Sequence, residues 1–359
     1  MSVGTSQTGI DDPSMVFGPP EIRTLGDAER TAWDRFVLTE PQATFFHLSG
    51  WQRIIERVCG HRTHYLYARR EGRITGVLPL AEIKSRLFGH SLLSTPFCVY
   101  GGFVATAEVD RHALEQRARS LAEQLDVDYL ELRNLHASTG EWQSKELYVT
   151  FRKTLSANET ENLHAIPRKQ RAMVRKGIQA NLKSEIDDDI ERFYDMYSIS
   201  VRNLGTPVLG RRYFAALLDE FGSAIEVMTV SLNDKPVSSV LSFYFRDQVL
   251  PCYGGGTGDA RDLKANDFMY WELMRRAVPR GSTLFDFGRS KVGTGSYRFK
   301  KHWGFEPEKL EYQYHLVRST EMPDLSPMNP KYRTMIAAWR RLPIWVSRAV
   351  GPMIARHLG

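Results

Sequence analysis

The sequence has 359 residues, of which 42% are hydrophobic and 25% are charged, and its net charge is +6. This length suits two domains of roughly 150 residues each, and the composition is that of a folded globular protein. No stretch approaches the roughly 18 uninterrupted apolar residues of a membrane-spanning helix. Residues 1–20 have neither the basic start nor the apolar run of a secretory signal, so we expect a flexible polar leader.

The cysteines and histidines argue against a disulfide framework and against a metal site. Cys59, Cys98 and Cys252 are odd in number and far apart in the chain. Disulfide frameworks need an even number of cysteines, and zinc sites need closely spaced ligand pairs. His61 and His64 are close together but have no third ligand nearby. We therefore expect no metal, and three inert thiols in a reducing cytoplasm.

The first half of the chain, residues 21–145, combines helical and strand patterns. In chain order it predicts helices over 28–40 and 48–60, a hairpin over 63–84, a β-rich run over 91–105, a helix over 110–126 and a strand over 127–134. Glu71 and Gly72 form the hairpin's turn signal.

The second half, residues 146–320, repeats this order. It predicts a strand over 147–155, a basic helix around 160–181, helices over 188–205 and 211–222, three strands within 225–256, a helix over 263–279, a strand over 283–288 and a strand over 310–317 that closes the sheet. The repetition indicates duplication of one α/β unit, although two unrelated α+β domains would give a similar pattern.

Residues 321–359 form a basic amphipathic tail. Six basic residues and no acid lie between Leu325 and Gly359, among apolar residues that include Trp339 and Trp345. Basic amphipathic segments with tryptophan bind anionic membrane surfaces. The alternative is that the aromatic residues pack on the second domain and complete its core.

Several segments of the chain resemble a known family. Strands in a meander, followed by a helix and a strand that splays from its neighbour, have the order of the GNAT (acyl-CoA N-acyltransferase) fold. Two such units in one chain resemble the Fem-type aminoacyltransferases. The strings at 166–177, 253–271, 284–307 and 329–352 look like the FemAB-related proteins associated with PEP-CTERM/exosortase systems, and those at 50–80 and 91–102 look like their first half.

The resemblance covers roughly residues 20 to 359 and implies two tandem GNAT-like domains, with mixed, mostly antiparallel sheets flanked by helices. It implies an enzyme that moves an acyl or aminoacyl group from an activated donor to an amine by direct attack. The acceptor would belong to the cell envelope, to peptidoglycan or to an exopolysaccharide pathway. The expected location is the cytoplasm, with or without peripheral contact with the inner membrane. The main cleft would lie in the second domain.

The donor is left open between acyl-CoA and aminoacyl-tRNA. Acetyl-CoA-using relatives carry an R/Q-x-x-G-x-G/A loop whose N–H groups hold the pyrophosphate. Here the glycines have a different spacing. The expected donor site consists of Tyr253, Gly254, Gly255, Gly256, Arg261 and Asn266. Glycine lets a ligand approach the backbone, and three consecutive glycines exceed what a turn needs, which favours a cradle for the donor over the alternative of a long flexible turn.

The candidate catalytic residues follow the short strand at 283–288. Asp286 lies between two phenylalanines, and burial would raise its pKa toward that of a general base. The alternative is a structural carboxylate paired with an arginine. Tyr297 is the candidate proton donor to the leaving group. Arg289, Lys291 and Lys300 would bind phosphate or carboxylate groups of the substrates.

Further binding residues come from other parts of the chain. Arg168, Arg171 and Arg175 share one face of the predicted basic helix, which suits a polyphosphate, a sugar nucleotide or tRNA, although a solvated helix face is the usual explanation of such a row. On the resemblance alone, Ser94 and Tyr100 would line the acceptor pocket.

Two other classes of function compete with the enzyme. One is a catalytically inactive GNAT-fold protein that keeps a ligand-binding cleft. The other is an RNA-binding protein, which the arginine row suggests. No known RNA-binding module is recognisable, and the net charge is modest.

Overall fold

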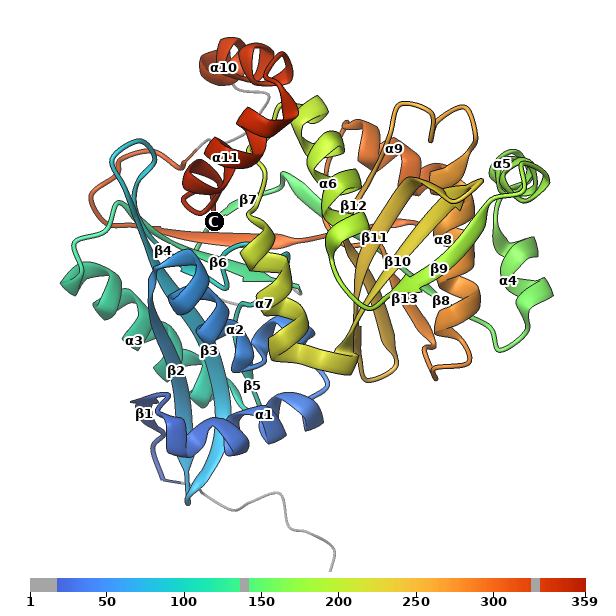
Figure 1. Cartoon of the computed structure of the whole chain (residues 1–359). Helices are drawn as coiled ribbons and strands as arrows, with labels where there is room; N and C mark the ends of the chain where they lie inside the picture. The colour runs from blue at the N-terminus through green and yellow to red at the C-terminus, as the bar shows by residue number, and fades with distance from the viewer. Residues whose placement is uncertain (1–17, 136–141, 324–329) are drawn as a thin grey trace, which may run out of the picture.

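The chain forms two sheets side by side, each flanked by helices (Figure 1). The structure, a computed structural model, describes residues 18–135, 142–323 and 330–359. Residues 1–17 of the expected leader lie outside these ranges, so the flexible leader stays a prediction. The two mixed sheets with flanking helices confirm the expected α/β fold class.

The first sheet has the strand order β1-β2-β3-β4-β6-β16-β7, with β5 paired to β3. Its strands are β1 (Glu21–Thr24), β2 (Arg62–Arg70), β3 (Arg73–Ser85), β4 (Gly89–Ser94), β5 (Val104–Ala105), β6 (Tyr129–Asn134), β7 (Gln143–Lys145) and β16 (Glu311–Leu316). The β2–β3 turn falls where the sequence predicted it, because Glu71 and Gly72 both adopt positive φ angles. β4 and β6 run parallel, which requires the crossover helix between them.

The second sheet has the order β14-β8-β13-β12-β11-β10-β9, with β15 paired to β8. Its strands are β8 (Tyr148–Thr154), β9 (Lys183–Asp187), β10 (Ile225–Leu232), β11 (Lys235–Phe245), β12 (Gln248–Gly256), β13 (Leu284–Asp286), β14 (Ser290–Lys291) and β15 (Pro307–Lys309). β12 and β13 form a parallel pair, whereas the meander of β9 to β12 is antiparallel.

The prediction that residues 310–317 close the second sheet is wrong. These residues form β16, which pairs antiparallel with β6 and β7 of the first sheet. β6 is buried along its whole length, so its free edge needs a partner. The chain supplies that partner by passing from β15 in the second sheet to β16 in the first, where Tyr312 and Tyr314 join the core. The boundaries expected for the two domains otherwise stay a prediction.

Helices cover the faces of both sheets. They are α1 (Arg30–Thr39), α2 (Gly50–Ile54), α3 (Glu108–Gln124), α4 (Glu159–Ala165), α5 (Arg168–Gln179), α6 (Glu191–Leu204), α7 (Arg211–Phe221), α8 (Ala265–Ala277), α9 (Gly295–His302), α10 (Pro330–Arg340) and α11 (Ile344–Ala355), with the short turns η1 (Asp27–Glu29), η2 (Phe45–His47), η3 (Ile55–Cys59) and η4 (Gly222–Ala224). The basic helix expected around 160–181 is divided into α4 and α5, because Pro167 disfavours a helical residue before it.

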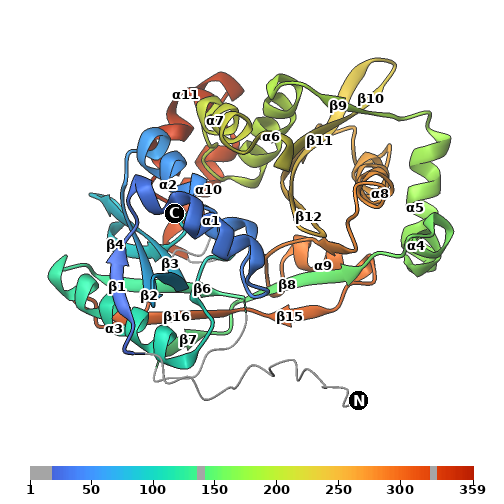
Figure 2. The same ribbon diagram turned by 90° about the horizontal axis from the view of Figure 1, so that it is seen from below.

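The two halves share a hydrophobic core. Phe45, between α1 and α2, stacks on Phe243 of β11 with ring centroids 4.5 Å apart, and Trp51 packs on Phe221 of α7. α1, α2, α6 and α7 accordingly gather on the same side of the molecule (Figure 2). Aromatic side chains of this size contribute much of the apolar burial, so the core holds the halves together.

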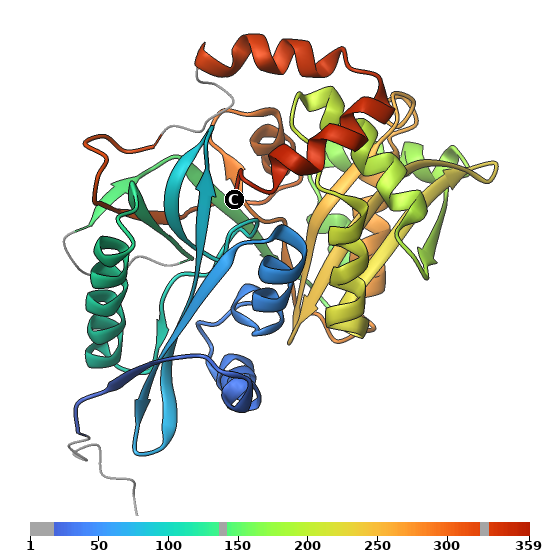
Figure 3. The same cartoon turned by 60° about the vertical axis from the view of Figure 1, so that its left-hand side comes forward.

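α11 lies on the body of the protein, whereas α10 contacts the body near its C-terminal end (Figure 3). Trp339 of α10 is only 8% exposed, and Ile336 closely approaches Gly205 at the end of α6. Arg202 of α6 donates a 2.9 Å bond to the carbonyl of Leu342. These contacts support the packing alternative for the inner face of the tail. None of the helices in the described part of the chain has the length and apolar character needed to span a bilayer.

Candidate active site

β12 and β13 diverge and leave an opening in the second sheet. Among the described residues they pair through Gln248 and Val249 at the start of β12. β12 then continues to Gly256, whereas β13 ends at Asp286. The backbone of β12 beyond this pairing therefore has a neighbouring strand only on its β11 side. In the described part of the chain, the backbone N–H and C=O groups on the β13 side of β12 therefore have no strand partner beyond Val249.

A β-bulge lies at the same point of β12. Leu241 of β11 lies opposite Tyr253, and Ser242 lies opposite Pro251, so Cys252 is the extra residue of the bulge. A bulge bends its strand and interrupts the ladder, and bulges are frequent beside active sites. Burial raises the pKa of the Cys252 thiol to about 12, which argues against a nucleophilic role for its sulfur.

The glycine run has a structural cause that the sequence did not reveal. Gly254, Gly255 and Gly256 are the last residues of β12, and not a loop that follows it. A Cβ atom at Gly255 would lie 2.5 Å from the carbonyl oxygen of Met196 in α6. The close packing of α6 on β12 therefore requires glycine at this position.

Two matched substitutions test this cause. We expect Gly255→Ala to destabilise the protein by about 1–3 kcal/mol, the usual cost of overpacking. Gly254→Ala, one residue earlier in the same strand, is expected to cost about 0.5 kcal/mol or less, because its Cβ would meet its nearest neighbour at an ordinary 3.4 Å. Urea unfolding of both variants measures the difference, and equal midpoints would show that α6 does not set the requirement.

A polar depression of about 570 Å³ lies at the end of β12. Residues from the end of β12 to the start of α8, and residues of α6, line it: Gly256, Thr257, Gly258, Ala260, Arg261, Asp262 and Asn266, together with Ser200, Asn203 and Leu204. Arg261 and Asn266, both expected at the donor site, therefore share one depression with Gly256. Tyr253 is set apart from it, because its hydroxyl contacts Tyr213 at 3.0 Å.

Asp286 is the centre of a buried polar cluster at the junction of the two halves. Its carboxylate accepts hydrogen bonds from Tyr100 at 3.0 Å, Thr150 at 3.2 Å and the Gly288 N–H at 2.7 Å. The Arg152 Nε lies 3.7 Å away. Asp286 is only 1% exposed, and this burial raises its pKa. The cluster thus has both features considered for this residue, a raised pKa and a nearby arginine.

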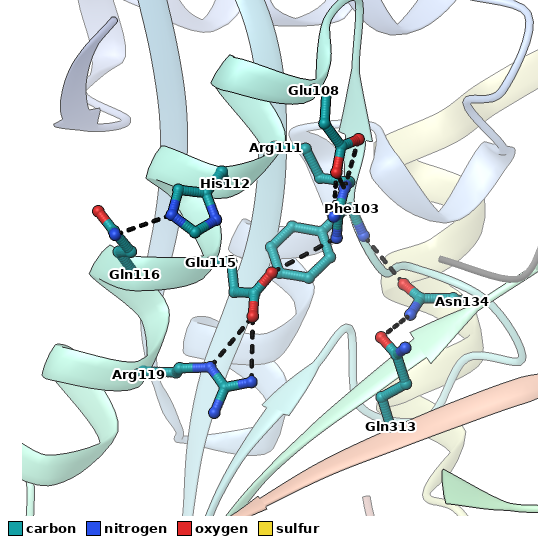
Figure 4. A network of polar contacts seen from close by, with 9 residues as sticks. All are labelled: Phe103, Glu108, Arg111, His112, Glu115, Gln116, Arg119, Asn134 and Gln313. Atoms are coloured by element: carbon teal, nitrogen blue, oxygen red, sulfur yellow. Dashed lines mark hydrogen bonds and ion pairs between the residues drawn. The ribbon is translucent and has the colours of Figure 1, made fainter. Parts of the chain in front are cut away.

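The loop that carries Tyr100 is anchored by Asn134 (Figure 4). The Asn134 side-chain oxygen accepts the N–H of Phe103 at 3.2 Å, and its nitrogen donates to Gln313 at 2.7 Å. A Cβ at Gly102 would lie 1.8 Å from that Asn134 oxygen. Asn134 therefore ties the loop to β6 and to β16, the strand contributed by the second half. The other contacts in Figure 4 belong to α3 itself and do not reach Asp286.

Lys300 and Arg289 lie beside Asp286. The Lys300 ammonium donates to the carbonyl oxygens of Gly288 at 2.9 Å and Arg289 at 3.1 Å, and burial lowers its pKa to about 8. Arg289 donates to the hydroxyl of Tyr312 at 3.0 Å. Both cations therefore hold the chain that follows Asp286.

Three other expected site residues have different surroundings. Tyr297 is half-buried on α9, one turn before Lys300, and its ring packs on Phe151. Lys291 lies in β14, paired with β8. Ser94 is fully buried, and its hydroxyl accepts the backbone N–H of Arg133 at 2.8 Å, so it belongs to the first sheet and not to the Asp286 cluster.

The arginine row is separated from this cluster. α8 packs between α5 and the second sheet, and the row lies on α5 (Figure 2). Arg168 and Arg175 are exposed. Arg171 donates to the carbonyls of His164 and Ile166, so it holds the bend between α4 and α5.

The structure adds residues that sequence reasoning missed. Thr150 and Arg152 of β8, together with Tyr312 of β16, complete the surroundings of Asp286 and Arg289. In the sequence these residues occupy ordinary inward-facing positions of strands, so no local pattern distinguishes them from residues of the core. The only available hint was their position in strands already expected to be buried.

A comparison with family models gives one match within the second half of the chain. Residues 167–301 match the family model described as acetyltransferase (GNAT) domain. The match falls in the half that holds the splayed strands. No curated protein matches the sequence.

Solved structures resemble most of the chain, as three examples show. The crystal structure of FemX has a TM-score of 0.64 and 16% identity, covering 88% of this chain and 100% of its own. The C-terminal domain of a putative lysylphosphatidylglycerol synthetase from Agrobacterium fabrum has a TM-score of 0.54 and 11% identity, covering 80% and 92%. A tandem GNAT protein from the clavulanic acid biosynthesis pathway has a TM-score of 0.50 and 14% identity, covering 85% and 100%. At these identities the likeness concerns the fold.

Proposed function

We propose that this protein is an N-acyltransferase that moves an acyl or aminoacyl group from an activated donor to an amine of a cell-envelope, peptidoglycan or exopolysaccharide-related substrate. The observation that carries the proposal is the opening between β12 and β13, with the bulge at Cys252 on one side and Asp286 on the other. The FemAB-related branch associated with PEP-CTERM/exosortase systems remains the proposed relative. The proposed location is cytoplasmic, with peripheral contact at the inner membrane.

The proposed reaction is direct attack. The donor carbonyl lies along the open edge of β12, where backbone N–H groups stabilise the developing oxyanion. The amine nitrogen attacks the carbonyl carbon, and its surplus proton passes to Asp286. The bond to the leaving thiolate or ribose oxygen breaks, and Tyr297 protonates that leaving group. Access to Asp286 requires movement of the Tyr100 loop, because the carboxylate is buried.

The donor is proposed to bind in the depression at the end of β12. Arg261 and Asn266 suit the phosphates of acyl-CoA or the end of a charged tRNA. The exposed Arg168 and Arg175 on α5 are proposed to contact a donor that is longer than acyl-CoA. A contribution of these two arginines to donor binding would therefore favour aminoacyl-tRNA.

The proposal is tested by offering the purified protein labelled acetyl-CoA or a mixture of tRNAs charged with labelled amino acids. Amine-bearing envelope precursors serve as acceptors, and transferred label is counted. Donor-dependent transfer is the expected result. Binding without transfer would instead identify a catalytically inactive ligand-binding protein. Binding of uncharged RNA as tight as that of charged tRNA would favour an RNA-binding protein.

Lys300 predicts a specific pH dependence. Below a pKa of about 8 its side chain is the ammonium that holds the Gly288 and Arg289 carbonyls, and above it the positive charge is lost and only a weaker, neutral amine donor remains. If the ammonium is required, the transfer rate should fall about tenfold per pH unit above that value. In Lys300→Arg the fall should move to higher pH, because arginine stays protonated. Because the wild type and Lys300→Arg are assayed with the same acceptor amine, the titration of that amine affects both pH–rate profiles equally. Identical profiles for the two proteins would contradict a role for the Lys300 ammonium.

A further inference from the structure

A groove outside the candidate active site lies where α11 meets the body of the protein. Its volume is about 490 Å³. Residues of four elements line it: η3, α6, the start of α7 and α11. These elements come together on the side of the molecule shown at the top of Figure 2.

Four arginines and no acid line this groove: Arg211, Arg212, Arg348 and Arg356. Glu191 pairs with Arg211, and Asp195 pairs with Arg348 at 2.7 Å. In the part of the chain that the structure describes, Arg212 and Arg356 form no ion pair with a carboxylate. Both guanidinium groups are exposed, and guanidinium binds phosphate through paired N–H donors. The Arg356 Nε donates to His357 at 3.1 Å, so Arg356 would bind an anion through its two terminal nitrogens.

The cationic surface continues beyond the groove. A second depression of about 220 Å³ shares Cys59 and Arg356 with the first, and adds Arg62 and Lys84 against the single acid Glu82. The excess of positive charge therefore extends over both sides of Arg356 and is not confined to one side chain.

The outer face of α11, beside the groove, is apolar. Trp345 is 71% exposed, Val350 39% and Met353 67%, and Met353 also lines the groove. Trp345 and Met353 are separated by eight residues, so they lie on the same side of the helix. Large apolar side chains that cluster on an exposed surface mark an interaction site.

The apolar side chains on the outer face of α11 are exposed while the inner face of the helix is packed on the body. Ser347, Gly351 and Ala355 recur every fourth residue and are buried. A Cβ at Gly351 would lie 2.8 Å from the backbone nitrogen of Val208, so the helix is packed closely on the body. The helix therefore presents its apolar face outward while it is docked.

We propose that this surface binds an anionic phospholipid bilayer, with a headgroup phosphate in the groove on Arg212 and Arg356 and with Trp345 and Met353 in the acyl boundary. Charge complementarity selects the anionic headgroup, and the adjoining apolar face selects a lipid over a free anion. Trp345 alone among these three apolar side chains offers a ring for a base to stack on, whereas Val350 and Met353 offer none, which favours a lipid over RNA. The inference rests on the peripheral membrane contact in the proposed function, and it assigns that contact a site.

The test is co-sedimentation of the full chain with vesicles of phosphatidylglycerol and phosphatidylcholine mixed at about 3:7. We expect binding to these vesicles and none to pure phosphatidylcholine. The double variant Arg212→Glu, Arg356→Glu should bind at least about 30-fold more weakly, from about 1 kcal/mol per cation. Trp345→Ser with Met353→Ser should also lose at least about tenfold, through lost apolar burial.

A charge-matched control is Arg168→Glu with Arg175→Glu on α5, which should bind the vesicles like the wild type. Melting curves of all variants should match, because the replaced side chains are exposed. Equal binding to neutral vesicles, undiminished binding by either groove variant, or release by millimolar inorganic phosphate would overturn the proposal. So would a dimer that Trp345→Ser dissociates, because a second copy would then cover α11. Vesicle binding is measured without any donor, so its failure is distinct from a failure of acyl transfer.

Discussion

Replacing Asp286 by asparagine is expected to lower kcat by about 10²–10⁴-fold, the loss that accompanies removal of a positioned acid or base. The fold should survive the change. The asparagine oxygen can still accept the Gly288 N–H, and the hydroxyls of Tyr100 and Thr150 can rotate to accept from its amide nitrogen. The measurement is the rate of acyl transfer beside the melting temperature.

Asp110 offers the matched control for this experiment. It is also a fully buried carboxylate, but it lies on α3, where it accepts bonds from Arg70 at 2.9 Å and Thr75 at 2.8 Å. Asp110→Asn should cost about 3–5 kcal/mol of stability, because it breaks a buried ion pair, and should leave the rate per folded molecule unchanged. If Asp286→Asn instead resembles Asp110→Asn, losing stability and keeping its rate, then Asp286 is a structural carboxylate.

The second large effect concerns the two tryptophans of the tail. Trp339→Ala should destabilise the protein by about 3–5 kcal/mol, because truncation of a buried aromatic leaves a cavity. Trp345→Ala should change stability by about 0.5 kcal/mol or less. The physical reason is exposure, since Trp339 is 8% exposed and Trp345 71%. Thermal unfolding of the two variants compares them directly.

Limited proteolysis extends this comparison to local unfolding. If α10 detaches without unfolding the body, Trp339→Ala should be cleaved faster within the tail while Trp345→Ala is not. Equal behaviour of the two variants in both assays would mean that the tail does not contribute to the stability of the body.

The candidate site was predictable in part. Asp286, Arg289 and Lys300 were expected together because they are close in the sequence and follow a buried strand. Tyr100 was expected in an acceptor pocket of the first half, on resemblance alone. The hydrogen bond between Tyr100 and Asp286 joins residues 186 positions apart. No local pattern reports such a separation.

The helices and strands themselves were decided by the sequence. The meander of β10 to β12, the helices α6 to α8 and the β2–β3 turn follow from apolar periodicity and from residues that tolerate positive φ, which are local properties. The tertiary structure decided the features that depend on contacts between different helices and strands. β16 joined the first sheet because β6 needed a partner on its open edge. Gly255 is glycine because α6 packs closely on β12, and one face of the tail is buried because α6 lies beneath it. Such choices depend on contacts between segments distant in the chain, and periodicity cannot show them.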